Sequence, residues 1–132
     1  MKLSRSIGYA MLAVGYVAQH QAKKSVLSQD ISKEYDIPLE YLLKILQQLV
    51  RASVLRSKRG PRGGFSLAKP SHKITILQIV EAVDGPLSSR LDLAEQTRGE
   101  KFGRRVEDTY EKAIAQARSV FEKAKLSDLL AE

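Results

Sequence analysis

The chain has 132 residues, 43% of them hydrophobic and 28% charged, a composition that indicates a folded domain and excludes a disordered chain. No window approaches 18 consecutive apolar residues, and tyrosines and glycines interrupt the apolar stretch near the amino terminus. We therefore expect no membrane span, no secretory signal and a cytoplasmic location. The sequence contains no cysteine, which excludes disulfides, thiol catalysis and thiolate-held metals.

The net charge of +7 is concentrated in the first part of the chain. Residues 1–75 carry 13 Lys and Arg against 4 Asp and Glu (+9), whereas residues 76–132 carry 9 against 11 (−2). This asymmetry is typical of a phosphate-binding module joined to a separate assembly element. A basic surface that serves only solubility is the alternative that charge alone leaves open.

A first helix is predicted from Ser4 or Ser6, either of which can cap it, to about Gln21. Its main apolar stripe has helical spacing and consists of Ile7, Ala10, Met11, Val14, Val17 and Ala18. A second stripe on another face consists of Tyr9, Leu12 and Tyr16. A helix that is apolar on two sides is expected to be buried on two sides, here by the domain core and by a partner chain.

A helix-turn-helix pattern follows. Ser28 is predicted to cap a short helix over residues 29–35, and Asp36-Ile37-Pro38 forms the break. Proline suits the first turn of the next helix, which we expect to end near Ala52. Many helical hairpins share this pattern, so the pattern alone does not identify the motif.

The helix that starts at Pro38 has two distinct faces at about 100° per residue. The face predicted to enter the core contains Leu42, Ile45, Leu46 and Leu49. The opposite face contains Glu40, Leu43, Lys44, Gln47 and Arg51. Most of these outer side chains are long and polar and can reach a base edge or a phosphate. Leu43 is either a scattered surface leucine or an apolar contact to a thymine methyl group in the major groove.

A basic hairpin comes directly after this helix. Val54–Lys58 and Phe65–Ala68 are predicted as paired strands, with Leu55, Phe65 and Leu67 as apolar anchors. The connecting loop consists of Arg59, Gly60, Pro61, Arg62, Gly63 and Gly64. A helix-turn-helix followed by a basic hairpin predicts a winged helix, and this order is more specific than either part.

The remaining chain is predicted to be helical. The sequence Thr75-x-x-Gln78 is a capping-box pattern, and Asp84-Gly85-Pro86 ends the helix that it opens. Residues 87–102 form a polar loop with one helical turn, and a long helix starts near Gly103. That helix either packs on its own domain or pairs with a second copy, and we favour pairing because the preceding domain is already complete. Together with Tyr9, the predicted dimer interface consists of Val106, Tyr110, Ala113, Ala117, Val120, Phe121 and Ala124.

Five short motifs occur in one order along the chain: Met1-Lys-Leu-Ser4, Tyr9-Ala10, Ile37-x-x-x-Tyr41-Leu42, Arg59-Gly-Pro-x-Gly-Gly-Phe65 and Ala82-Val-Asp-Gly-Pro86. On these motifs the sequence resembles the Rrf family of dimeric bacterial winged-helix transcription regulators. The resemblance is close over residues 1–86 and looser as far as Leu130. It implies that the helix from Pro38 enters the major groove while the wing follows the minor groove. It also implies that Tyr41, Lys44 and Arg59 occupy positions that touch DNA.

Two departures from the family pattern bear on function. Cluster-binding members have a base-reading glutamate where this chain has Leu43, and a leucine cannot accept a hydrogen bond from the amino group of cytosine, so we expect a different operator. Those members also place three cysteines in the segment that is 88–102 here. Without cysteine no thiolate-held iron–sulfur cluster is possible, and we predict no cofactor. His20 and His72 are isolated in the sequence and are interpreted as ordinary surface or capping residues.

The predicted fold is mainly α with a small β-hairpin: a winged helix-turn-helix domain over residues 1–86, a linker or sensing loop over 87–102, and a dimerisation helix with a final turn over 103–132. The predicted function is that of a homodimeric regulator, a repressor, on a pseudo-palindromic operator in double-stranded DNA. The predicted DNA-binding residues are Ser28, Glu40, Tyr41, Leu43, Lys44, Gln47, Arg51, Lys58, Arg59, Gly60, Pro61, Arg62, Gly63 and Gly64.

Three other functions are less favoured by the sequence. A winged helix that binds an acidic protein partner is the main alternative, because the fold does not exclude it. RNA binding is less favoured because few aromatic residues are free to stack on bases. No nucleophile is paired with a base, so we expect no enzyme. An effector, small molecule or protein, would find its pocket between the first helix, residues 87–102 and the long helix.

Overall fold

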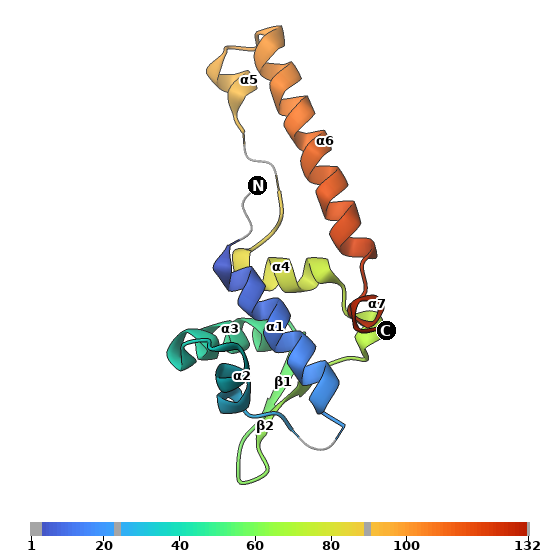
Figure 1. Cartoon of the computed structure of the whole chain (residues 1–132). Helices are drawn as coiled ribbons and strands as arrows, with labels where there is room; N and C mark the ends of the chain where they lie inside the picture. The colour runs from blue at the N-terminus through green and yellow to red at the C-terminus, as the bar shows by residue number, and fades with distance from the viewer. Residues whose placement is uncertain (1–3, 23–24, 89–90, 132) are drawn as a thin grey trace.

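The computed structural model describes residues 4–22, 25–88 and 91–131. The winged domain is made of α1 (Arg5–His20), α2 (Ser28–Tyr35), α3 (Leu39–Arg51), β1 (Leu55–Lys58), β2 (Gly64–Leu67), the short 3-10 helix η1 (Ser71–Lys73) and α4 (Ile76–Asp84). It is followed by α5 (Leu93–Gln96), α6 (Lys101–Lys123) and α7 (Leu126–Leu130). In Figure 1 the hairpin of β1 and β2 projects from the bottom of the winged domain, and α6 projects upward from this domain, with α5 beside the upper end of α6. The predicted mainly α fold with one small hairpin is confirmed.

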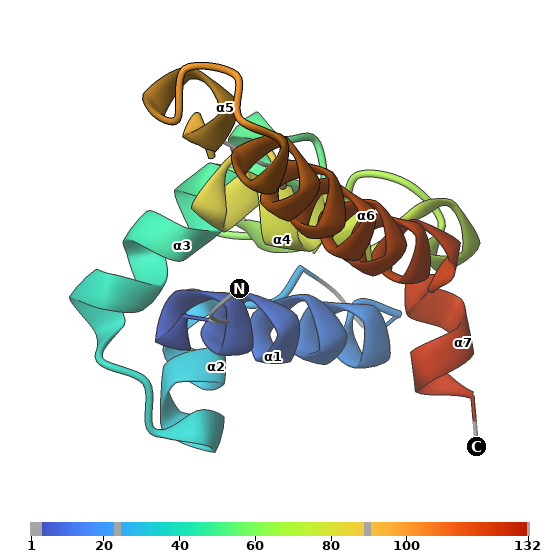
Figure 2. The same cartoon turned by 90° about the horizontal axis from the view of Figure 1, so that it is seen from above.

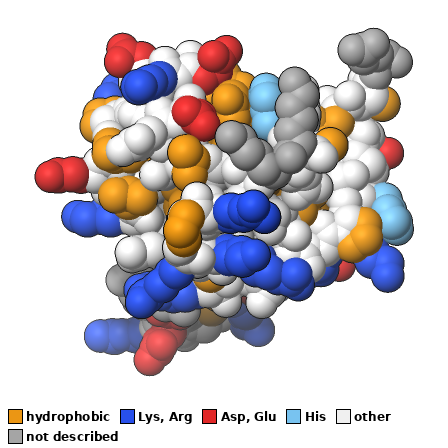
Figure 3. All heavy atoms as spheres, turned by 90° about the horizontal axis from the view of Figure 1, so that it is seen from below, with side chains coloured by type: hydrophobic (Ala, Val, Ile, Leu, Met, Phe, Trp, Pro, Cys, Tyr) orange, Lys and Arg blue, Asp and Glu red, His pale blue; other side chains and the backbone are white. Residues whose placement is uncertain are grey.

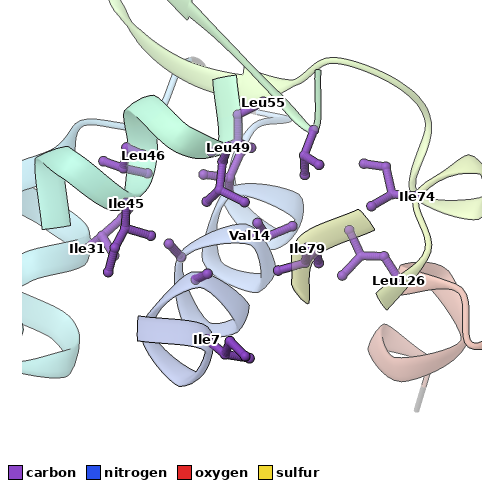
Figure 4. Close-up of a cluster of buried hydrophobic side chains, with 14 of the residues drawn as sticks. Ile7, Val14, Ile31, Ile45, Leu46, Leu49, Leu55, Ile74, Ile79 and Leu126 are labelled. Atoms are coloured by element: carbon purple, nitrogen blue, oxygen red, sulfur yellow. The ribbon is translucent and has the colours of Figure 1, made fainter. Parts of the chain in front are cut away.

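The core is apolar and lies between α1, α3 and α4 (Figure 4). From α1 it receives Ile7, Ala10, Ala13, Val14 and Val17. The four predicted core residues of α3 are all buried. The second apolar stripe of α1 is divided, because Leu12 is 41% exposed whereas Tyr9 and Tyr16 pack against the edge of the core. No polar side chain is buried in the part of the chain that the structure describes.

The turn between α2 and α3 depends on one left-handed residue. Asp36 has φ 54° and ψ 49°, and Ser32 Oγ donates a hydrogen bond to the carbonyl of Ile37 (2.6 Å). Pro38 stands just before α3, where its missing N–H removes no helical hydrogen bond. The prediction that Ser28 caps α2 is wrong: Leu27 holds the cap position without a side-chain hydrogen bond, and Ser28 is the first helical residue.

The wing is fastened to the rest of the domain at its base. The two strands pair from Leu55 opposite Leu67 to Lys58 opposite Gly64, each offset by one residue from its predicted start. Val26 forms an antiparallel bridge with Phe65, with N···O distances of 2.9 and 2.7 Å. The N–H of Leu67 donates to Gln21 Oε1 (2.8 Å), at the end of α1. The hairpin is therefore positioned by a backbone bridge and a side-chain hydrogen bond to the segment between α1 and α2.

The amino terminus of α4 has the predicted capping box. Gln78 N–H donates to Thr75 Oγ1 (3.2 Å), and Thr75 N–H donates to Gln78 Oε1 (2.9 Å). Gly85, with φ 81°, ends the helix. Leu77 is buried although it lies outside the main core cluster, and α4 contacts α6 as well as α1 and α3.

The long helix α6 is divided between two environments. It begins at Lys101, two residues before the predicted start, and Ile114 is buried beside the domain. Beyond it the chain returns to the junction of η1 and α4: Ile76 N–H donates to the Ala124 carbonyl (2.9 Å), and Leu126 N–H donates to the Ile74 carbonyl (2.8 Å). The final part of the chain therefore completes the winged domain, whereas the first half of α6 projects from it (Figure 1).

Candidate nucleic-acid interface

The outer face of α3 is exposed to solvent. The predicted outer residues Glu40, Leu43, Lys44, Gln47 and Arg51 are all exposed. The buried face holds α3 against α1, α2 and α4, so the orientation of the outer face is fixed by the core. The predicted division of this helix into two faces is confirmed.

The amino-terminal end of α3 is held by Tyr41. Its hydroxyl is hydrogen-bonded to the hydroxyl of Ser6, and its ring meets the Tyr9 ring edge-on, with centroids 5.7 Å apart and planes at 84°. Tyr41 remains 40% exposed. Tyr9, which was predicted at the dimer interface, thus uses part of its ring to position α3, and its remaining surface is half-buried.

Glycines give the wing its tight tip. Gly60 has φ 104°, and its carbonyl accepts a hydrogen bond from Gly63 N–H (2.8 Å). A Cβ at Gly63 would collide with the backbone oxygen of Lys58. Gly64 has φ 143°, and a Cβ there would lie 2.6 Å from the Val26 oxygen. The glycines are therefore required by the backbone path, and they leave the charged side chains at the tip exposed.

A groove separates the exposed end of α3 from the wing. It is lined by Leu27, Ser28, Gln47, Val50, Arg51, Ser57, Lys58, Arg59, Gly64 and Phe65. Six of these residues were predicted from the sequence to bind DNA: Ser28, Gln47, Arg51, Lys58, Arg59 and Gly64. The lining contains three basic side chains and no acidic one. Tertiary folding thus brings α2, α3 and the wing to one cationic surface.

Three more of the predicted residues line a neighbouring hollow. Pro61, Arg62 and Gly63 line a second hollow on the wing, together with Ser25 and Leu27. Leu27 borders both hollows and is 46% exposed, and sequence reasoning missed it. The signal that could have found it is its position directly before Ser28, where an apolar residue has no core partner.

Positive charge dominates the face that carries the wing. Figure 3 shows Lys and Arg side chains gathered in a band on this face, with apolar side chains beside them and most acidic side chains nearer the margin. Within residues 4–22, 25–88 and 91–131, the one ion pair joins Arg118 and Glu81, in α6 and α4. The basic side chains of α3 and the wing therefore keep their charge available to a polyanion.

Several of the residues predicted at a dimer interface line an open apolar groove on α6. The groove is formed by Phe102, Arg105, Val106, Thr109, Tyr110 and Ala113. Phe102 is 74% exposed and was missed, although it lies one turn before Val106 on the same face. Val120 is 66% exposed further along the helix, and Ala117 is half-buried. Phe121 and Ala124 differ from these residues, because both pack against the chain's own core.

Comparison with known proteins agrees with this architecture. Residues 3–132 match the model of the Rrf2 family, described as "Iron-dependent Transcriptional regulator". The HTH-type transcriptional regulator IscR of Cereibacter sphaeroides is 40% identical over 86 residues, which are 64% of this chain and 56% of that protein. The chain thus matches little more than half the length of this relative.

Solved structures show the same fold. CymR, titled the global cysteine regulator of B. subtilis, superposes with a TM-score of 0.83 at 22% identity, over 98% of this chain and 96% of that one. IscR of T. potens superposes with a TM-score of 0.74 at 23% identity, over 98% of this chain and 86% of that one. At sequence identities this low, the similarity to these structures shows a shared fold and nothing more specific.

The residues of this chain do not fit a cysteine-held iron centre. The sequence contains no cysteine, and no three His, Asp or Glu side chains gather as ligands in the described ranges. Around α5 the polar groups have protein partners instead: Thr97 Oγ1 donates to the Leu93 carbonyl (2.7 Å), and Ala94 N–H donates to Glu107 Oε1 (2.8 Å). A thiolate-held centre therefore has no ligands here.

None of the helices in the described ranges combines the length and the apolar content needed to cross a bilayer. The relatives and the family are transcription regulators and not enzymes, as the sequence predicted. The order of motifs, the helix-turn-helix with its wing and the match over residues 3–132 lead to one conclusion: this chain belongs to the Rrf2 family of transcriptional regulators.

Proposed function

We propose that the protein is a homodimeric, sequence-specific DNA-binding repressor located in the cytoplasm. In this proposal α3 enters the major groove and the wing follows the adjacent minor groove. The observation that carries it is the cationic groove in which Arg51, Lys58 and Arg59 meet without an acidic neighbour. Phosphates supply most of the salt-sensitive affinity of such a surface, and base edges supply the specificity.

Assembly supports the same proposal. The uncovered apolar face of α6 is suited to pairing with the same face of a second copy, since a twofold interface is self-complementary. Two copies present two recognition helices, which fit the two half-sites of a pseudo-palindromic operator. Regulation requires no thiolate-held cluster in this proposal. An effector pocket between α1, residues 87–102 and α6 stays a prediction.

The test is DNA binding measured by fluorescence anisotropy, on a duplex selected from random sequences by the protein itself. We expect affinity to fall steeply with salt, and a scrambled duplex of equal composition to bind much more weakly. Arg59→Ala should weaken specific binding by about 1–3 kcal/mol if the arginine reads a groove. Lys44→Ala should reduce the salt slope by about 1 if this lysine contacts a phosphate.

Lys123→Ala is the matched control, because it removes the same charge from the exposed end of α6. It should leave both affinity and salt slope near those of the unchanged protein. The proposal would be contradicted if the selection enriched no DNA sequence, or if the affinity for DNA did not change with salt concentration. In that case the cationic groove would be tested against an acidic protein partner, for which Arg59 and Lys44 should matter while DNA should not compete.

A further inference from the structure

An apolar pair interrupts the polar outer side of α3. Leu39 is 36% exposed and Leu43 is 37% exposed, and they stand one helical turn apart. In the described residues nine large hydrophobic side chains are exposed, and four of them lie between positions 27 and 43. This concentration on the helix-turn-helix is not what scattered surface leucines would produce.

The core of the domain does not explain this pair. The opposite face of α3 already supplies four fully packed side chains, Leu42, Ile45, Leu46 and Leu49. Lys44 and Gln47 are exposed beside the pair, and the basic groove begins at Gln47 on the same helix. Glu40 is also exposed on this face, but the groove lining adds three basic side chains and no acidic one. The partner that fits is therefore apolar at a few points and negatively charged around them.

Duplex DNA offers this combination in its major groove. The thymine 5-methyl is the one apolar group among the base edges there, and the phosphates on both sides are negative. Residues near the amino terminus of a recognition helix are the ones that reach base edges, and Leu39 and Leu43 are in the first two turns of α3. A rise of 1.5 Å per residue places them about 6 Å apart along the axis, close to two base-pair steps of about 3.4 Å.

We propose that Leu39 and Leu43 read thymine 5-methyl groups, so that each operator half-site carries two thymines one or two base steps apart. The inference rests on the proposed DNA-binding function and names the base feature that the site recognises. A leucine has no donor or acceptor for a base, so methyl burial is its means of discrimination. Burial of one methyl corresponds to about 0.8 kcal/mol, which is about fourfold in affinity.

The experiment replaces thymine by deoxyuridine, which lacks only the 5-methyl group and keeps the base pairing, the phosphates and the O4 acceptor. Each thymine of the selected duplex is replaced singly, and binding is measured by fluorescence anisotropy. We expect two positions in each half-site at which affinity falls about fourfold. Leu43→Ala should bind more weakly and lose its response to deoxyuridine at one of these positions, and Leu39→Ala should lose it at the other.

Leu129→Ala is the matched control, because this leucine is 65% exposed on α7. Figure 2 shows α3 and α7 on opposite sides of α1. This variant should respond to deoxyuridine as the unchanged protein does. Leu43→Met keeps an apolar side chain of similar reach and should retain the response. Circular dichroism checks that both alanine variants are folded, as expected for substitutions at exposed positions.

The outcomes separate this inference from the proposed function. Specific binding that is unchanged by deoxyuridine at every position would overturn the inference and leave the DNA-binding proposal intact. A methyl response that persists in both alanine variants would also overturn it, because another side chain would then contact the methyl groups. Absence of any sequence-specific duplex would overturn the proposed function itself.

Discussion

The apolar faces of two amphipathic helices differ in what covers them: the face of α3 is buried by its own chain, whereas much of the face of α6 is exposed. In α3 the side chains of Leu42, Leu46 and Leu49 have no exposed surface. In α6 the buried residues are Gly103 and Ile114, while other apolar side chains on the helix remain open to solvent. Helical periodicity therefore shows that a face must be covered, but it does not show which molecule covers it.

The position of each helix in the fold accounts for this difference. Helix α3 lies against α1, α2, α4 and β1, so its apolar side is enclosed by its own chain. Helix α6 contacts α4 near the domain and α5 at its projecting end. Substitutions in the apolar face of α3 should therefore change folding, and those in the open face of α6 should change assembly.

The largest effect is expected from Leu46→Ala in α3. This side chain is fully buried, so truncation removes its packing and leaves a cavity. The free energy of unfolding should fall by about 2–5 kcal/mol, measured by urea denaturation with circular dichroism. Leu129→Ala, at a 65% exposed leucine, should stay within about 0.5 kcal/mol. Equal losses in the two variants would break the distinction between covered and open faces.

An intermediate effect on assembly is expected from Tyr110→Glu in the α6 groove. A buried, unpaired carboxylate opposes association, so the dimer dissociation constant should rise about 100-fold, or about 2.7 kcal/mol. Sedimentation velocity measures this change, and circular dichroism should show that the monomer stays helical. Ala115→Glu places the same charge on the opposite, exposed face and should leave the dimer intact. Loss of the fold in Tyr110→Glu would mean that the open face stabilises its own chain.

The smallest effect is expected from Arg118→Ala, which removes the ion pair between α6 and α4. Its Nη1 lies 2.9 Å from Glu81 Oε2, and the two side chains are 43% and 25% exposed. Because solvent screens this pair, the free energy of unfolding should change by less than about 1 kcal/mol, and less again at high salt. A double-mutant cycle with Glu81→Gln isolates the pair. A larger coupling would show that charge, and not the packing of Ile114, attaches α6 to the domain.

Local features of the fold could be predicted well from the sequence. The Thr75–Gln78 capping box and the two faces of α3 are formed as expected, because short-range hydrogen bonds and helical spacing determine them. The prediction that Ser28 is the N-cap of α2 was wrong, since the position of an N-cap depends on the backbone conformation of one residue. Leu77 is buried outside the main core cluster, on a helix that also contacts α6, and spacing within one helix does not reveal a contact with an element more than 20 residues later.

The sequence by itself determined the order of elements, the basic character of the first half and the absence of thiolate ligands. Only the tertiary structure decided that Ser28, Arg51 and Arg59 border one groove, and that Phe121 and Ala124 serve the chain's own core. The tertiary structure also left Leu39 and Leu43 exposed on α3, the helix whose later residues border that groove. The physical reason is that local spacing sets which side of a helix is apolar, whereas long-range packing sets what that side meets.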